Sequence, residues 1–423
     1  MKIIIVHHRY FVAGGPERYL FNIIDLLEKN GHEIIPFSIK NKLNKPSIYE
    51  DYFLDPIGDD EVYFNEYKKT DVKTVFKSFS RMFYSFEAKK KLNKLIKAVT
   101  PDLIYVLQYQ NKISVSIFDA AAKNKIPAIH RISDFGHICA DNLFFRPRQQ
   151  DICERCLIGN KLNAVYNKCV LDSYFYSSIK IASLKFQEIA GISKKVSSFV
   201  IPSKFTIGRL EAHGFPKQKL NHIPTFFNFN SDFKELPVSY EPFALYIGRI
   251  SPEKGLFTLI KSFENTAFNL KIIGFPNHGF ENALKDYLKG KSHKIEFLGK
   301  QNFSNIQIYL SKCAFTVVPS EWYDNLPNSI LESYAFKKCV VATDIGSLKE
   351  IVINNQTGLL FKLKNVVDLR NKITYLFNNQ KECRNLGSNA FISLNNEFSA
   401  ESHYDKLITL FKNTRTNFSL KNV

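Results

Sequence analysis

The chain has 423 residues, more than one hydrophobic core usually organises, so we expect two domains of roughly 200 residues each. Its composition, 45% hydrophobic and 23% charged, is that of a globular protein and excludes an intrinsically disordered chain. The net charge is +18, and the first 230 residues carry more of it than the rest. The first half is therefore expected to offer a basic surface to an anionic partner.

Apolar runs in the sequence are short. None reaches the eighteen or so residues that a membrane span needs, and the opening MKIIIVHHRY is too soon polar for a signal peptide. We therefore expect a cytoplasmic protein, in which the seven cysteines stay reduced.

The first elements in the chain predict a βαβ unit. An apolar strand at 2–6 leads into Gly14 and Gly15, and Pro16 opens a helix whose apolar residues recur at helical spacing until Gly31. A second strand follows. Three later apolar runs predict further strands: 102–107, 126–133 and 197–203. This order favours a parallel sheet with covering helices.

The segment 73–97 is strongly basic. It carries eight Lys and Arg residues and one Glu, interleaved with five aromatic residues. This pattern predicts a surface helix that lies on anionic lipid headgroups, and the alternative is an ordinary solvated helix face.

Four of the seven cysteines fall within the segment 139–169. Their spacing is Cys139-x13-Cys153-x2-Cys156-x12-Cys169, and one C-x2-C with two flanking cysteines can form a four-thiolate structural zinc site. The alternative, inert packing cysteines, explains Cys153 and Cys156 poorly because their surroundings are polar. The other three cysteines lie in or beside apolar runs and are expected to pack in a core: Cys313, Cys339 and Cys383.

A polar stretch with two prolines, 228–242, is the best linker. After it the strand pattern restarts, with candidates at 243–250, 270–275, 294–299, 314–320 and 339–343. We expect two doubly wound, Rossmann-like α/β domains facing across a cleft, with ligands at the carboxyl ends of the strands. The domains are predicted at 1–230 and 240–400, and a last helix at 401–423 is predicted to return to the first domain.

Two cations follow the first strand of the second domain. Gly248 and Arg249 come directly after it, and Lys254 lies five residues further on, before a helix. An Arg and a Lys on one strand-end loop match a diphosphate, whereas the plainer interpretation is a pair of exposed loop cations.

A polar segment, EWYDNLPNSILES at 321–333, interrupts the apolar pattern. Pro327 is predicted in the first turn of a helix that ends near Lys337, so that the amino end of this helix attracts phosphate oxygens. Asp324 before the helix and Glu332 inside it can hold ligand hydroxyls. Cations with carboxylates fit a nucleotide sugar; the alternative is an N-cap aspartate and a solvated glutamate. Trp322 is predicted either to wall the sugar pocket or to pack in the core.

The sequence closely resembles the retaining glycosyltransferases of family four, which have the GT-B fold. The resemblance covers most of the chain and rests on GGPERYL, IGRISPEKG, IEFLGK, the carboxylate pair with seven residues between, VVATDIGSLKEIV and NNQTGLLF.

The resemblance implies roles for individual residues. Arg249 and Lys254 match the pair that neutralises the donor diphosphate, and Glu332 matches the glutamate that binds the donor ribose. Asp324 stands where the family usually has the first glutamate of its motif, so the choice of sugar can differ. The implied donor-binding residues are Gly14, Gly15, Gly248, Arg249, Lys254, Asp324, Asn325, Leu326, Pro327, Asn328 and Glu332, with Glu17 just after the glycine loop.

The resemblance also implies a carboxylate on the acceptor side. In HRISDFGHIC the family often has His-Asp where this chain has Ser133 and Asp134. Asp134 is carried over as the acceptor-side or catalytic carboxylate, while His130 is expected to be a strand-end residue. The implied catalytic set is thus Arg249, Lys254, Asp134 and Asp324.

The resemblance implies an enzyme that moves a sugar from a UDP- or GDP-sugar to a glycan or lipid-linked acceptor with retention of configuration. Its place is expected to be cell-surface polysaccharide synthesis at the inner face of the membrane, with no cofactor required for catalysis and no nucleic-acid partner. Three alternatives stay open: a nucleotide-sugar epimerase of the same fold, a nucleic-acid-binding protein, and a non-catalytic scaffold. No recognised nucleic-acid reader motif is present, which counts against the second.

Overall fold

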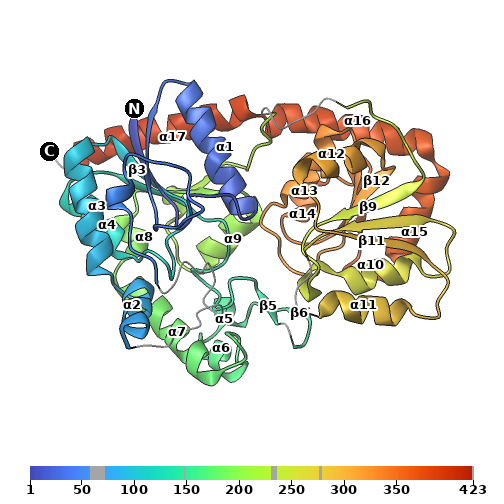
Figure 1. Ribbon diagram of the computed structural model, residues 1–423, viewed down its shortest axis with the longest axis horizontal. Coiled ribbons are helices and arrows are strands. Elements are labelled where there is room, and N and C mark those ends of the chain that lie inside the picture. Colours follow the sequence, from blue (N-terminus) through green and yellow to red (C-terminus); the bar gives the residue numbers. More distant parts are fainter. Residues whose placement is uncertain (58–71, 147, 230–235, 276–278, 422–423) are drawn as a thin grey trace.

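The protein consists of two α/β domains that lie side by side (Figure 1). This computed structural model describes residues 1–57, 72–146, 148–229, 236–275 and 279–421. None of the helices in these ranges is both long enough and apolar enough to cross a membrane.

The N-terminal domain is built on six parallel strands in the order β2-β1-β3-β4-β7-β8. Their bounds are β1 (Lys2–Val6), β2 (Glu33–Phe37), β3 (Leu103–Val106), β4 (Ala128–Arg131), β7 (Ser198–Ile201) and β8 (Leu220–His222). The apolar runs at 2–6, 102–107, 126–133 and 197–203 form β1, β3, β4 and β7. The central strands are almost wholly buried, as expected of a parallel sheet that helices cover on both faces.

Helices surround this sheet. The first, α1 (Gly15–Lys29), begins one residue earlier than expected, so Pro16 is its second residue, and it ends before Gly31. The others that follow in this domain, outside the cysteine segment, are η1 (Glu50–Tyr52), α2 (Val72–Met82), α3 (Phe86–Val99), α4 (Ser116–Lys123), α8 (Ile192–Lys195), α9 (Lys204–Ala212) and η3 (Lys217–Lys219).

The basic segment 73–97 forms two helices, not the single helix that the sequence predicts. The Ser85 side chain accepts a hydrogen bond from Ala88 N and caps α3, so a new helix begins here and does not continue α2. Arg81 is fully buried and pairs with Glu87 at 2.9 Å, so it belongs to the core and not to a lipid-facing surface.

Between β4 and β7 the chain forms a small layer of its own that contains the cysteine segment. It consists of the antiparallel pair β5 (Phe145–Arg146) and β6 (Asp151–Ile152), the short helices α5 (Arg155–Ile158) and α6 (Asn163–Tyr166), and the longer α7 (Tyr174–Ile189). In Figure 1 the β5-β6 pair extends toward the C-terminal domain.

The C-terminal domain repeats the plan with six parallel strands in the order β11-β10-β9-β12-β13-β14. These are β9 (Phe243–Ile247), β10 (Asn269–Ile273), β11 (Lys294–Gly299), β12 (Phe315–Val318), β13 (Val340–Thr343) and β14 (Gly358–Phe361). The five predicted strands form β9 to β13. The helices are η4 (Pro252–Lys254), α10 (Leu256–Phe263), α11 (Phe280–Leu288), α12 (Phe303–Lys312), α13 (Asn328–Ala335), α14 (Leu348–Ile351), α15 (Val366–Asn378) and α16 (Gln380–Glu397).

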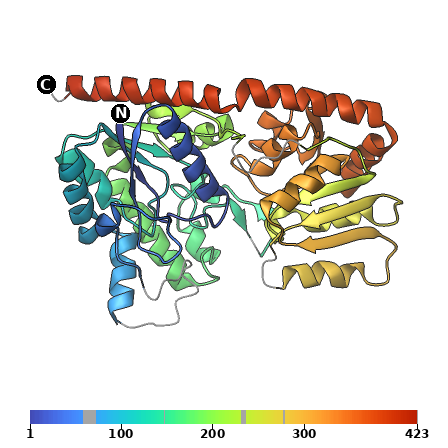
Figure 2. The ribbon, with the colours of Figure 1, turned by 45° about the horizontal axis from the view of Figure 1, so that its top comes forward.

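The last helix, α17 (Ala400–Lys421), crosses back to the N-terminal domain. Figure 2 shows α16 and α17 end to end along one side of the molecule, with α17 over the N-terminal half. Leu407 and Phe411 are buried in the cluster that contains β1, β3 and α1, and Arg415 pairs with Asp102 at 2.8 Å. The end of the chain thus completes the core of the first domain.

Candidate functional site

A buried ion pair joins two of the predicted site residues, Lys254 and Asp324. Lys254 ends η4, which follows β9, and Asp324 lies in the loop after β12. Lys254 Nζ donates to both carboxylate oxygens, at 2.8 and 2.9 Å, and Ser320 Oγ donates to Asp324 Oδ2 at 2.6 Å. Only 14% and 8% of the two side chains are exposed, so little solvent screens this pair.

Gly255 explains how the two loops come so close. It has φ of +70°, and a Cβ at this position would lie 1.9 Å from Pro319 O, the residue after β12. Only glycine allows this approach. The sequence IGRISPEKG therefore positions Lys254 through its last glycine as well as its cations.

Arg249 takes a different position from Lys254. Its side chain is 57% exposed and pairs with Glu253 at 2.9 Å. Tyr246 Oη donates to Arg249 O at 2.6 Å, which fixes the backbone of the loop after β9 beside Gly248. The guanidinium thus lies on the same loop as Lys254 but is accessible from solvent.

The start of α13 faces the glycine loop of the other domain. Pro327 is the N-cap of this helix, one position before the first turn in which the sequence predicts it, and no side chain caps the helix. A Cβ on Gly15 would lie 3.3 Å from Asn328 Nδ2, so the starts of α1 and α13 are neighbours. The N-cap of α1, Gly14, has no capping side chain either. Two amino ends with backbone N–H groups free of side-chain caps therefore meet here.

Glu332 is bound by the opposite domain. It lies on α13 with 5% of its side chain exposed, and Arg18 on α1 donates to its Oε1 at 2.7 Å. The Arg18 guanidinium also lies 5.8 Å from the centre of the Phe303 ring. We call the set of Arg18, Arg249, Lys254, Asp324 and Glu332, with the two glycines of the loop before α1, the interdomain site.

The loop before α13 is anchored in the N-terminal domain. The Tyr323 ring packs against Phe205 with ring centres 4.5 Å apart. The Asn325 amide oxygen accepts from Ser203 and Thr206, at 3.2 and 2.9 Å. The side chains of Tyr323 and Asn325 thereby hold this loop of the second domain against the first domain.

Trp322 is half-buried beside Lys254, whose Nζ lies 5.0 Å from the centre of the indole ring. Its indole Nε1 is buried and has no hydrogen-bond partner within the described residues. The side chain thus contacts a residue of the interdomain site.

The glycine loop of the first domain leads to a buried carboxylate. Glu17 is 1% exposed and pairs with Arg9 at 3.1 Å, while its Oε2 has no hydrogen-bond partner in the described part of the chain. His7 at the end of β1 is also buried, and burial lowers its pKa to about 4, so it is neutral at pH 7.

Asp134 lies in the loop after β4. Its Oδ1 accepts from Gly136 N at 2.8 Å, and burial raises the pKa of its carboxyl, opposed by this hydrogen bond and by the charge of Lys180. The same loop reaches the C-terminal domain, since Asn325 Nδ2 donates to Ile132 O at 3.4 Å. Within the described residues, Asp134 forms no hydrogen bond or ion pair with Lys254 or Asp324.

His130 serves the core of the first domain. Its Nδ1 lies 2.9 Å from Val106 O and its Nε2 lies 3.0 Å from His137 Nε2. Burial lowers its pKa to about 4. Its neighbour Ser133 accepts a hydrogen bond from Arg131.

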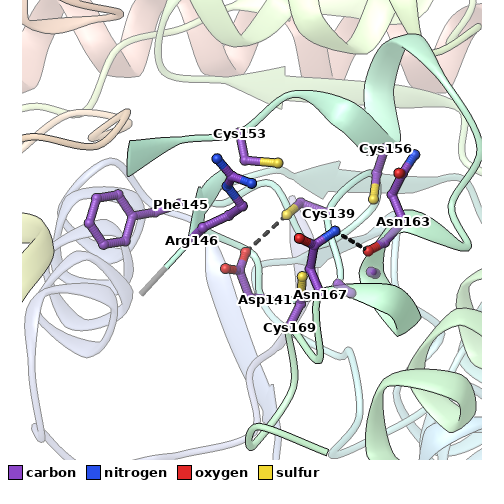
Figure 3. A pocket seen from close by; sticks show the side chains of 11 residues that line it. Cys139, Asp141, Phe145, Arg146, Cys153, Cys156, Asn163, Asn167 and Cys169 are labelled. Atoms are coloured by element: carbon purple, nitrogen blue, oxygen red, sulfur yellow. Dashed lines mark hydrogen bonds between the residues drawn. The ribbon is translucent and has the colours of Figure 1, made fainter. Parts of the chain in front are cut away.

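The four cysteines of the segment 139–169 line one pocket (Figure 3). In the described part of the chain, however, no three His, Cys, Asp or Glu side chains are already placed as a group that could hold a metal ion. Cys313, Cys339 and Cys383 are buried in the C-terminal domain, and the last two have their sulfurs 3.6 Å apart.

Three contributors to the interface were not singled out from the sequence: Arg18, Ser203 and Thr206. Arg18 stands within the quoted GGPERYL, three residues after Gly15, which places it near the start of α1. Ser203 is the last residue of the strand predicted at 197–203, and its side chain caps α9. Both signals are local, and neither names a partner in the other domain.

Residues 228–392 match the family described as "Glycosyl transferases group 1". Over 166 residues the chain is 34% identical to an uncharacterized glycosyltransferase of Methanocaldococcus jannaschii, covering 39% of this chain and 45% of that protein. It is 31% identical over 164 residues to the N,N'-diacetylbacillosaminyl-diphospho-undecaprenol alpha-1,3-N-acetylgalactosaminyltransferase of Campylobacter jejuni, covering 37% and 41%. The matches thus span less than half the length of these two relatives.

Solved structures match nearly the whole chain. Sucrose-phosphate synthase from Thermosynechococcus elongatus has a TM-score of 0.68 at 17% identity, covering 97% of this chain and 98% of that one. Anabaena HepE, solved in complex with UDP-glucose, has a TM-score of 0.64 at 14% identity, covering 98% and 100%. With the two six-stranded parallel sheets, these likenesses show the GT-B fold, and the match of residues 228–392 shows group 1 glycosyltransferase homology in the second domain.

Proposed function

We propose that this protein is a retaining glycosyltransferase that moves a sugar from a UDP- or GDP-sugar to a glycan or lipid-linked acceptor. One observation carries the proposal: Lys254, Asp324, Glu332 and the uncapped start of α13 converge opposite the glycine loop of the other domain. The solved HepE complex contains UDP-glucose, which supports a nucleotide-sugar donor in a protein of this fold.

Each group has a task that suits its chemistry. Lys254 and Arg249 would neutralise the diphosphate, and the backbone N–H groups at the start of α13 would donate to its oxygens. Glu332 would accept hydrogen bonds from the ribose hydroxyls, and Asp324 from a hydroxyl of the sugar. The buried position of the lysine and both carboxylates strengthens these contacts.

Transfer with retention can proceed on the front face of the sugar. The acceptor oxygen bonds to the anomeric carbon while the bond from that carbon to the diphosphate oxygen breaks. The electron pair leaves with the diphosphate, and the acceptor proton passes to the same oxygen. The protein then needs no nucleophile of its own, and its main contribution is to stabilise the charge of the leaving group.

A membrane-bound acceptor is supported by the surface of α2 and α3. Phe76 and Phe86 are each 76% exposed, and three lysines of α3, Lys90, Lys94 and Lys97, are exposed beside them. Exposed aromatic rings next to lysines suit an anionic lipid surface. The relative from Campylobacter jejuni is named for a diphospho-undecaprenol acceptor, which is consistent with this proposal. We place the function in cell-surface polysaccharide synthesis.

A donor screen and a variant pair test the proposal. Thermal shifts with UDP-, GDP- and ADP-sugars identify the donor, because a ligand that binds only the folded state stabilises it. With that donor, Lys254→Ala should lose about 10²- to 10³-fold in transfer rate. The matched control is Lys285→Ala, which removes an exposed ion pair on α11 and should retain the rate. A Lys254→Ala protein that keeps more than half of the activity would sink the assignment.

Product analysis separates the competing activities. The anomeric configuration of the new bond decides whether transfer occurs with retention. A sugar altered in the absence of any acceptor would instead indicate an epimerase, and donor binding without turnover on a broad acceptor panel would indicate a scaffold.

Membrane association has its own measurement. Co-sedimentation of the protein with anionic vesicles should fall when Phe76 and Phe86 are both replaced by Ser, because the protein then lacks the two exposed rings that would contact the lipid. The control Ile392→Ser removes an exposed apolar side chain on α16 of the other domain and should leave binding unchanged. Equal sedimentation of both variants would contradict a lipid-facing role for α2 and α3.

A further inference from the structure

The layer between β4 and β7 has a small apolar cluster of its own, apart from side chains such as Phe144 that pack into the main core of the first domain. This cluster holds Ala140, Cys156 and Ala164, with Cys169, Val170 and Ile181 packed against them. A disulfide or a metal ion commonly reinforces so small a cluster. Cysteines make up a third of this cluster.

Four cysteines from separate stretches of backbone meet at that place. Cys139 lies in the loop after β4, Cys153 directly follows β6, Cys156 is on α5 and Cys169 comes after α6. All four line the same pocket, and Figure 3 shows their side chains arranged around it. The β5-β6 pair and the turns of α5 and α6 therefore bring the sequence-distant thiols together.

The backbone already fixes these positions. Cys139 N donates to Phe135 O at 2.8 Å, Cys153 N to Phe144 O at 2.8 Å, and Cys169 N to Ala164 O at 3.0 Å. The sulfurs themselves have weaker partners. Cys139 Sγ donates to Asp141 at 2.9 Å, and Cys156 Sγ lies 3.9 Å from Lys161 O. Their backbone is thus held while their sulfurs can turn about χ1 between staggered positions.

We infer that this pocket is a structural zinc site in which Cys139, Cys153, Cys156 and Cys169 supply four thiolates. The thiols do not yet form a coordinating group as placed, so binding requires their sulfurs to turn inward to about 2.3 Å from the ion. Zn²⁺ replaces the four thiol protons, which leave to solvent, and no electron transfer takes place.

The pocket also holds a carboxylate, because Asp141 lines it beside the four thiols, and a negative charge there favours a bound cation. Arg146 lines the pocket as well and would offset part of the negative charge of a four-thiolate site.

A zinc ion here would support the interdomain site. Glu154, between two of the ligands, pairs with Arg209 at 2.8 Å, and the Arg209 guanidinium lies 5.9 Å from the Tyr323 ring centre. Phe144, close to the β5-β6 pair, has its ring centre 6.3 Å from that of Tyr323. The metal would thus hold the surface on which the loop before α13 rests.

The test is the metal content of the full chain, purified without chelator from cells supplied with zinc. We expect about one zinc ion per chain, its loss in Cys153→Ser, and its retention in Cys313→Ser, a cysteine buried in the other domain. Replacement by Co²⁺ should give the absorption spectrum of a tetrahedral thiolate site, which a packing cluster would not give.

Clear results would overturn the inference. They are less than about a tenth of an equivalent of zinc in the wild-type chain, a zinc content unchanged by Cys153→Ser, or a disulfide between any two of the four cysteines in freshly purified protein. If Cys153→Ser does not fold, the wild-type zinc content and the Co²⁺ spectrum still decide. All of these readouts are independent of glycosyl transfer.

Discussion

Arg18 and Glu332 are 314 residues apart in the chain, and the Arg18 guanidinium donates to the Glu332 carboxylate at 2.7 Å. Arg18 belongs to α1 of the first domain and Glu332 to α13 of the second. A residue of one domain therefore holds the carboxylate that we propose for the donor ribose in the other. The proposed contact with the ribose and the observed contact between the domains would therefore use the same carboxylate.

The first prediction concerns this pair. Arg18→Met leaves the buried Glu332 carboxylate without its partner in the free protein, whereas ribose hydroxyls would still satisfy it in the complex. The free state is destabilised more than the bound one, so nucleoside diphosphate should bind up to about fivefold more tightly, equivalent to about 1 kcal/mol. Isothermal titration measures the affinity.

The control for Arg18 is Arg415→Met, which removes an arginine of similar exposure from an ion pair on α17, away from the interdomain site. It should leave the affinity unchanged. Weaker binding by Arg18→Met would instead mean that the guanidinium contacts the diphosphate. Failure of the wild-type protein to bind any nucleotide would count against the proposed function itself.

The second prediction concerns Asp324, which stands where the family that the sequence resembles usually has a glutamate. Asp324 is 6% exposed and its carboxylate is held by Lys254 and Ser320. Asp324→Glu adds one methylene group to this packed position, which should cost about 1 to 3 kcal/mol of stability. We therefore expect a lower melting temperature and slower transfer, not a gain from restoring the family residue. If this variant transferred the sugar as fast as the wild-type protein or faster, the site would not be shaped for the shorter aspartate side chain.

The third prediction concerns the anchor of the donor loop. Tyr323 packs among Phe135, Phe144 and Phe205 of the first domain. Tyr323→Ala should destabilise the protein by about 2 kcal/mol, less than a fully buried aromatic residue, and should raise the donor KM. Tyr323→Phe keeps the ring and should stay close to wild type. Melting curves and donor titrations report both effects, and an unchanged KM in Tyr323→Ala would show that the loop holds its position without this anchor.

The fourth prediction concerns acid. His403 on α17 lies 2.7 Å from Pro224 O and 3.0 Å from the Tyr19 hydroxyl, and burial lowers its pKa from 6.5 to about 3. The unfolded chain therefore binds the proton first as the pH falls. The stabilising contribution is fully present above pH 6.5 and is lost below it at up to about 1.4 kcal/mol per pH unit.

Melting temperatures measured from pH 7.5 to 4.5 test this sign. The wild-type protein should lose stability as the pH falls, and His403→Gln should lose less over the same range because one protonation is removed. A variant with the same pH dependence as the wild-type protein would show that His403 does not take part in acid unfolding.

Much of the fold follows from local patterns. The apolar runs that predict strands form β1, β3, β4, β7 and β9 to β13, because a strand buried on both faces must be continuously apolar. The edge strand β8 was not predicted, since its three residues, Leu-Asn-His, show no such run. The sequence predicts one helix over 73–97 because the basic and aromatic residues continue past Ser85, whereas in the structure the Ser85 side chain caps α3 and separates it from α2.

The sequence by itself determined which residues can do chemistry here: Lys254, Asp324 and Glu332 are charged groups beside strand ends and a helix start, and a strand-end position is a local property. The partner of each charge was decided only by the tertiary structure. That Arg18 reaches Glu332, and that Ser203 and Thr206 hold Asn325, depends on how two separately folded sheets are set against each other. Such contacts between domains leave no periodicity in either segment, because each side chain only has to be polar and exposed on its own domain.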